Sequence, residues 1–148
     1  MTQDISGFGA IVTLIASNTF PNGITISQFA DDGDSINFSV QKIADTAMGM
    51  NGNLVAWAHA EPISMDINMV PNGDDDQNLQ VIANANRVAN GKVSANDIIS
   101  LVIAYPDGRT ASLSGGKLIS APPGNSITNN GRLKSKAYAF MFEKVSGT

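Results

Sequence analysis

The chain has 148 residues, a length that fits one domain, spanning residues 1–148, with room for a hydrophobic core. It has no cysteine, which excludes a disulfide framework and a thiolate metal site, and its formal net charge of −4 disfavours direct nucleic-acid binding. The longest apolar run, Phe8 to Ala16, is far shorter than the roughly 20 residues of a membrane-spanning helix, so we expect no contact with a membrane.

Turn signals divide the chain into segments of strand length. Seven Asn-Gly or Asp-Gly pairs occur, and such pairs supply the positive φ that tight hairpin turns require. This spacing is typical of a β-sandwich or barrel. A turn is expected at Phe20–Gly23 and a bulge at Gly115-Gly116. The predicted strands cover residues 10–17, 24–30, 35–40, 54–60, 63–70, 98–105, 110–113, 117–120 and 132–145.

The segment Gln41 to Asn53 is predicted as a loop that contacts another subunit. It carries more apolar side chains than an ordinary surface loop, which is the alternative interpretation, and loops longer than about 12 residues usually have a function. Methionine adapts well to a partner surface. The candidate contact residues are Ile43, Ala44, Met48, Gly49, Met50 and Asn51.

Two later strands show where a core should lie. In Ile63–Val70 the apolar residues alternate with Ser64, Asp66 and Asn68, which should therefore face outward. The last strand is apolar on both faces, with Tyr138, Phe140 and Phe142 on one face and Ala137, Ala139 and Met141 on the other. That pattern predicts an interior strand covered on both sides.

Asp74 to Gly91 is the one segment that is predicted as a helix. Asp74 can serve as N-cap and Gln77 can complete a capping box. Leu79, Ile82 and Ala83, continued by Asn86 and Ala89, lie on one face, and Gly91 can take the left-handed conformation that ends a helix. We expect this helix to pack on the flank of a sheet.

The residues offer no catalytic constellation, so an enzyme is not expected and neither is a cofactor. His59 is the only histidine and is expected to be packed or on the surface, while Trp57, Tyr105 and Tyr138 are expected in the core. Asp74, Asp76 and Asn78 match the first ligand spacings of a calcium loop, but Leu79 stands where the loop needs glycine. We therefore interpret these aspartates as helix-capping residues and expect no metal site.

Charge is unevenly distributed along the chain. Residues 1–76 hold ten acidic residues and one basic residue, for a net charge of −9, whereas residues 77–148 have a net charge of +5. Chance within one folded domain is one interpretation. The other is a molecule with an acidic and a basic pole, suited to head-to-tail association.

Several stretches together resemble the tail tube proteins of contractile-tailed bacteriophages. They are QFADDGDSINF, QKIADTAMGMNGNLVAW, NMVPNGDDDQNL, AYPDGR and GRLKSKAYAFMF, and the resemblance covers most of the chain. These tube proteins are similar in fold to the haemolysin-coregulated protein of type VI secretion. The resemblance implies a mainly β (α+β) fold, in which two antiparallel sheets pack as a sandwich or barrel with one flanking helix.

The resemblance also implies a function in the virion. Such proteins self-assemble into hexameric rings that stack into the tail tube, through which DNA passes without specific binding, and an early loop bridges to neighbouring copies. Tail sheath and baseplate proteins would be further partners, and assembly would take place in the host cytoplasm. Ser64, Asp66 and Asn68 are then candidates for the face that lines the channel. The alternatives are a tail terminator or another ring-forming virion component, or a β-sandwich module that binds carbohydrate or a receptor.

Overall fold

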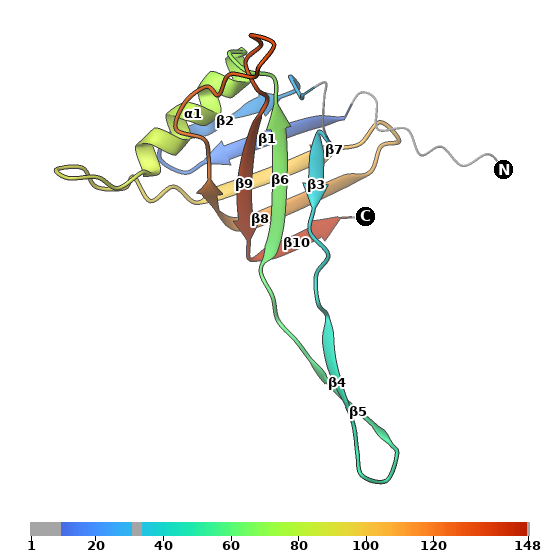
Figure 1. Cartoon of the computed structure of the whole chain (residues 1–148). Coiled ribbons are helices and arrows are strands. Elements are labelled where there is room, and N and C mark those ends of the chain that lie inside the picture. The colour runs from blue at the N-terminus through green and yellow to red at the C-terminus, as the bar shows by residue number, and fades with distance from the viewer. Residues whose placement is uncertain (1–9, 31–33, 148) are drawn as a thin grey trace.

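The protein is built from one antiparallel strand system that forms two packed sheets, with a helix on the flank (Figure 1). The computed structural model describes residues 10–30 and 34–147. Its strands are β1 (Ile11–Ala16), β2 (Phe20–Ile26), β3 (Ile36–Phe38), β4 (Ala44–Met48), β5 (Leu54–Ala58), β6 (Ile63–Met69), β7 (Ile99–Ala104), β8 (Thr110–Ser120), β9 (Lys136–Phe142) and β10 (Lys144–Gly147). The helix is α1 (Asp74–Asn86).

Strand β8 belongs to both sheets. The strand order is β2-β1-β7-β8-β9-β6-β3, and β10 pairs with the first half of β8. Between β7 and β8 the register shifts, because Ile99 pairs with Gly116 while Leu101 pairs with Leu113. The expected bulge at Gly115-Gly116 is thus confirmed, and Gly115 has a φ of +67°. In Figure 1, β1 and β7 run across the direction of β6 and β9, so the two sheets face each other.

The core lies between these sheets and follows the alternation in the sequence. The burial pattern of β1 alternates strictly, and in β6 Met65, Ile67 and Met69 are fully buried, as predicted. Full burial of one such side chain contributes about 1.5–3 kcal/mol. Tyr138 and Phe140 supply the inner face of β9. The predicted fold class, an antiparallel β-sandwich with one flanking helix, is confirmed.

Two of the differences from the predicted strands change the path of the chain. Phe20–Gly23 is part of β2 and not a turn, because the chain reverses earlier, at residues 17–19, and Ala16 pairs with Phe20. The long final strand is divided at Glu143. Its first part, β9, pairs with β6 in one sheet, and the rest, β10, pairs with β8 in the other.

Helix α1 packs through the predicted face, with Leu79 and Ile82 fully buried, but both of its ends differ from the prediction. The N-cap residue is Gly73 and no side chain caps the helix, so the capping box of Asp74 and Gln77 is not formed. The helix ends at Asn86 instead of Gly91. The Asn86 side chain donates a hydrogen bond to the Ile82 carbonyl (2.8 Å) and another to Asp97 (2.8 Å).

The aspartates at the start of α1 connect the helix to both sheets. Asp75 accepts hydrogen bonds from the backbone N–H groups of Ser27 (2.8 Å) and Gln28 (3.0 Å), just after β2. Asp76 is paired with Lys136 of β9 at 3.0 Å, and both side chains are almost completely buried. The Tyr138 hydroxyl donates to Asp76 at 2.7 Å. Burial, followed by the hydrogen bond and the charge of Asp76, raises the pKa of Tyr138 above its ordinary value.

The fold places the two oppositely charged halves of the sequence side by side. β1 pairs with β7, and β6 pairs with β9, so the strands of the basic half, β7, β8 and β9, lie in the middle of the order with strands of the acidic half on both sides. Asp75, Asp76 and Lys136 are buried and bonded internally. The asymmetry along the chain therefore does not correspond to two separate lobes.

Candidate assembly surfaces

Strands β4 and β5 form a separate two-stranded sheet that extends away from the sandwich (Figure 1). They pair from Ala44 opposite Ala58 to Met48 opposite Leu54. The turn between them is closed by a hydrogen bond from the Gly49 N–H to the Asn53 carbonyl (2.8 Å). The segment 41–53 is therefore one strand and the turn of a hairpin, and its prediction as a loop was wrong. We call residues 41–61 the hairpin arm.

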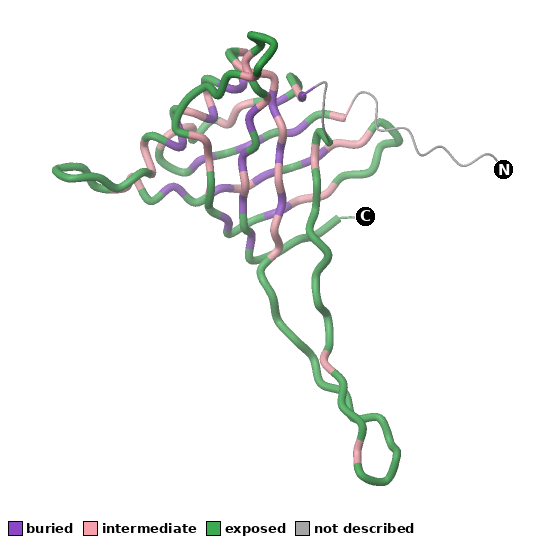
Figure 2. Tube along the Cα trace, viewed as in Figure 1, coloured by how far each residue is buried: buried purple, intermediate pink, exposed green. Residues whose placement is uncertain are grey.

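The hairpin arm exposes apolar side chains on both of its faces. Figure 2 shows its residues as exposed along nearly the whole arm. The six large apolar side chains and their exposed fractions are Ile43 77%, Met48 70%, Met50 106%, Leu54 67%, Val55 51% and Trp57 51%. An isolated two-stranded hairpin is at best marginally stable in water, and contiguous exposed apolar surface marks an interaction site. This arm is the best candidate for contact with another chain.

The candidate contact residues lie in this arm, but the sequence identified only half of it. Ile43, Ala44, Met48, Met50 and Asn51 are exposed, and Gly49 is half-buried in the turn. Leu54, Val55 and Trp57 of the second strand were missed, and Trp57 was wrongly expected in the core. The signal available in the sequence was that residues 54–58 are apolar at every position. In the structure all five are exposed.

Polar contacts hold the two sides of the arm together near its base. His59 Nδ1 lies 3.1 Å from Asp45 Oδ2, and Lys42 contacts Asp45 as well. The Lys42 N–H donates to the Glu61 carboxylate at 2.6 Å. His59, expected as a packed or surface residue, is thus partly exposed and joined to Asp45. Exposed ion pairs of this kind contribute about 0–1 kcal/mol, so they align the arm more than they stabilise it.

The outer face of β6 and β9 forms a second uncovered surface. Ser64, Asp66 and Asn68 lie here, half-buried, opposite Met141, Ala139 and Ala137 of β9. The expectation that β9 is covered on both sides is wrong for the described residues, since Ala137 and Met141 are exposed. The apolar pattern on this face did not indicate a covered face because the side chains of Ala137 and Ala139 are too small to build a core layer. This face is polar toward the Asn68 end and apolar toward Met141.

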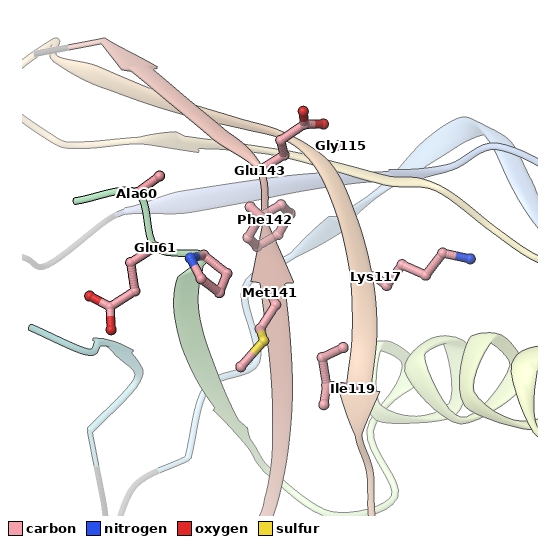
Figure 3. Close-up of a pocket in the computed structure, with 9 residues that line it drawn as sticks. Ala60, Glu61, Gly115, Lys117, Ile119, Met141, Phe142 and Glu143 are labelled. Carbon is pink, nitrogen blue, oxygen red and sulfur yellow. The ribbon is translucent and has the colours of Figure 1, made fainter. Parts of the chain in front are cut away.

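The apolar end of this face is hollowed into a pocket of about 500 Å³ (Figure 3). Met141 and Phe142 of β9 and Ile119 of β8 provide apolar lining. Pro62 and Ala60 border it from the segment that leads out of the hairpin arm. The remaining lining residues are Glu61, Gly115, Lys117 and Glu143. The pocket therefore lies at the base of the arm and combines an apolar interior with charged neighbours.

Neither a metal cluster nor a membrane-spanning helix occurs within residues 10–30 and 34–147. No group of three or more histidine, aspartate or glutamate side chains is placed there to hold a metal ion. None of the described helical residues form a helix long and apolar enough to cross a membrane. Asp76, considered above for a calcium loop, is instead engaged by Lys136 and Tyr138.

Solved structures with a similar fold come from contractile injection systems. A chain in the cap that terminates the tube of the anti-feeding prophage matches with a TM-score of 0.56 and 14% identity, covering 100% of this chain and 93% of that chain. A chain in the six-fold symmetrised baseplate of the same system matches with a TM-score of 0.62 and 10% identity, covering 100% and 97%. These low identities show a shared fold.

A third similar structure and a family model complete the comparison. A chain in the sheath/tube terminator of the extracellular contractile injection system PVC, in its extended state, has a TM-score of 0.56 and 13% identity, covering 100% and 99%. No curated protein sequence matches the chain. The family model described as tail fiber protein gp32 matches residues 3–146. Because that match spans nearly the whole chain, the protein belongs to the tail fiber protein gp32 family and has the fold of structural components of contractile injection systems.

Proposed function

We propose that this protein is a non-enzymatic, ring-forming structural component of a phage tail, located in the virion around the central channel. The observation that carries the proposal is the hairpin arm, whose apolar side chains are exposed on both faces. A surface of this kind in a protein that functions alone would promote aggregation. In an assembly, neighbouring copies cover it, as the similarity to tube-cap, terminator and baseplate structures supports.

A protruding arm favours a ring over a two-fold dimer. Contact between the arm of one copy and a different surface of the next is heterologous, and heterologous contacts generate closed rings or helical filaments. We propose six copies per ring, in keeping with the six-fold symmetry of the baseplate that contains one of the similar chains. Tail sheath and baseplate proteins are the proposed further partners, and assembly is proposed to take place in the host cytoplasm.

The polar part of the outer sheet face suits the wall of a channel. Ser64, Asp66 and Asn68 present small polar or acidic groups, and Ala137 and Ala139 add no bulk. Phosphate groups are repelled by a carboxylate such as Asp66 and find no basic side chain at these five positions. DNA could therefore pass such a wall without binding to it.

Two positions within the tail are compatible with this architecture. A tube protein stacks its rings repeatedly, whereas a terminator forms one ring at the end of the tube. The terminator alternative is favoured by two of the similar chains, which come from a tube-terminating cap and from a sheath/tube terminator. Electron microscopy of the purified protein distinguishes them, because a tube protein forms tubes of variable length and a terminator forms single rings.

The test of the common proposal combines microscopy with a charge substitution in the arm. Met48 and Leu54 are cross-strand neighbours, and we expect the double variant M48D/L54D to lose rings and tubes completely while remaining folded. Val93→Asp is the matched control, because this valine is 85% exposed but lies outside the arm. Monomers of the unmodified protein at every concentration and salt condition would contradict the proposal.

A second candidate is a fibre protein that binds a receptor or carbohydrate on the host. The family description and the half-exposed Trp57 favour it, since aromatic side chains stack on sugar rings. Of the other two aromatic residues that were considered for this role, Tyr138 is fully buried and Tyr105 is half-buried against the core. If this candidate is correct, Trp57→Ala will abolish binding to host cells or glycans and leave any assembly intact.

A further inference from the structure

The tip of the hairpin arm is exposed in its own molecule, and the pocket beside Met141 has the apolar lining that would cover such a tip. The tip, residues 47–55, contains no charged side chain and includes Met48, Met50 and Leu54. It cannot reach the pocket of its own chain. The extended segment 54–62, at about 3.3 Å per residue, holds the tip roughly 25–30 Å from the pocket, and Figure 1 shows the tip pointing away from the body.

We propose that the pocket lined by Ile119, Met141 and Phe142 is the receiving site for the hairpin tip of a second copy. This inference rests on the proposed function and names the partner surface for its arm. The volume of about 500 Å³ falls in the range of pockets that bury whole small ligands, so several apolar side chains fit. Met50, which is fully exposed at the end of the tip, is the first of them.

The position of the pocket supports a second copy of this chain as the partner. The outer sheet face is polar around Asp66, where it is proposed to line the channel, but apolar at Met141 and Ile119, which are 40% and 54% exposed. Such apolar side chains are unsuited to a water-filled wall. An uncharged tip that covers them removes apolar surface from water on both copies at once.

The polar groups of the two surfaces also complement each other. Figure 3 shows Glu61 on one side of the pocket, Lys117 on the other and Glu143 at one end. The tip presents the side-chain amides of Asn51 and Asn53, which can donate to a carboxylate and accept from an ammonium group. An apolar centre with a polar rim is the arrangement found in stable protein interfaces.

Cross-linking tests this contact directly, because the chain has no cysteine of its own. Met50→Cys and Ile119→Cys are purified separately, mixed and treated with a short bismaleimide. We expect a band of twice the monomer mass, at least about fivefold stronger than in each variant alone. Met50→Cys mixed with Val102→Cys is the control, since Val102 is exposed on a strand of the other sheet.

A second measurement uses the critical concentration for assembly. Met141→Arg places a charge in the pocket and is expected to raise this concentration at least about tenfold. Ala137→Arg places the same charge on the polar part of the same strand face and is expected to leave it within about twofold. Equal effects of the two substitutions would contradict the proposed site.

The outcomes separate this inference from the proposed function. Rings or tubes without the Met50–Ile119 cross-link overturn the pocket contact and leave the ring proposal standing. The cross-link without rings or tubes supports the contact and overturns the ring proposal. Absence of both the cross-link and the assemblies overturns the two together, and presence of both supports the two together.

Discussion

The flank around α1 and the hairpin arm use apolar residues in opposite ways. At the flank, Leu79 and Ile82 are fully buried, and the charged groups of Asp76 and Lys136 are bonded to each other. In the arm, Met48, Leu54 and the neighbouring apolar residues remain in water. The apolar residues of the flank therefore stabilise the fold of one chain, whereas those of the arm remain available for the proposed contact with a second chain.

The buried ion pair at the flank offers the strongest way to test this contrast. Lys136→Met leaves the Asp76 carboxylate buried without its cation and should cost about 3–5 kcal/mol of the free energy of unfolding. Urea unfolding measures the loss. Lys134→Met, on an exposed residue nearby, is the control and should change stability by less than about 0.5 kcal/mol. A loss below about 1 kcal/mol in K136M would show that the pair is not closed in solution.

The apolar contact of the same helix should have a comparable or slightly smaller effect. Leu79→Ala removes a fully buried side chain and leaves a cavity, so we expect a loss of about 2–5 kcal/mol. Val81→Ala on the half-exposed side of the helix is the control and should cost less than about 1 kcal/mol. Thermal or urea unfolding distinguishes them, and equal losses would refute the observed orientation of α1.

Asp97 connects the flank to the β1–β2 turn and gives the flank a pH dependence. Burial would raise its pKa, but hydrogen bonds from Thr19 and Asn86 side chains and from the backbone of residues 18 and 19 outweigh burial and lower it. With a lowered folded-state pKa, its contribution is complete above the unfolded pKa of about 3.9 and is lost as the pH falls through the folded value.

Substitution of Asp97 isolates that contribution. Asp97→Asn should cost about 1–3 kcal/mol near pH 7, because the carboxylate accepts from Asn18, Thr19 and Asn86. The difference between the variant and the unmodified protein should begin to shrink below about pH 4, where the carboxylate is protonated in the unfolded state, and should be lost as the pH falls through the lowered folded-state pKa. Unfolding curves at pH 7 and pH 3 measure this change, and a difference that is constant with pH would contradict it.

The smallest effect on stability is expected in the arm. Trp57→Ser should change the free energy of unfolding of the monomer by less than about 0.5 kcal/mol, although it removes the largest side chain of the chain. The residue is half-exposed and packs against no element of the sandwich core. Tyr138→Phe, at a buried hydroxyl, is the comparison and should cost more, about 1–2 kcal/mol. A larger loss for W57S would show that the arm packs on its own body.

The sequence predicted the elements whose pattern is local. The alternation of Ile63–Val70, the bulge at Gly115-Gly116 and the buried face of α1 were all confirmed, because each depends on periodicity or on backbone conformations that neighbouring residues determine. The end of α1 was not predictable in this way. Asn86 ends the helix through a hydrogen-bond network with Asp97, eleven residues away, which no local pattern reveals.

The candidate surfaces were predicted in part for the same reason. Met48 and Met50 were identified because a run of apolar residues in a presumed loop is unusual, whereas Trp57 was assigned to the core because apolar strands usually are buried. The pocket combines Ile119, Met141 and Pro62 from three separate segments. Its existence depends on the pairing of β6, β8 and β9, and could not be inferred from any one of them.

The lack of packing around the hairpin arm has a consequence for the kinetics of assembly. Closing a hairpin takes about 1–10 μs, so the arm can form and open many times before two copies meet. Part of the free energy of the first contact is then used to order the arm, which makes that contact weak and short-lived. In the proposed ring, incorrectly joined copies would then separate before they are trapped, and only a closed ring, in which every arm is held, would persist.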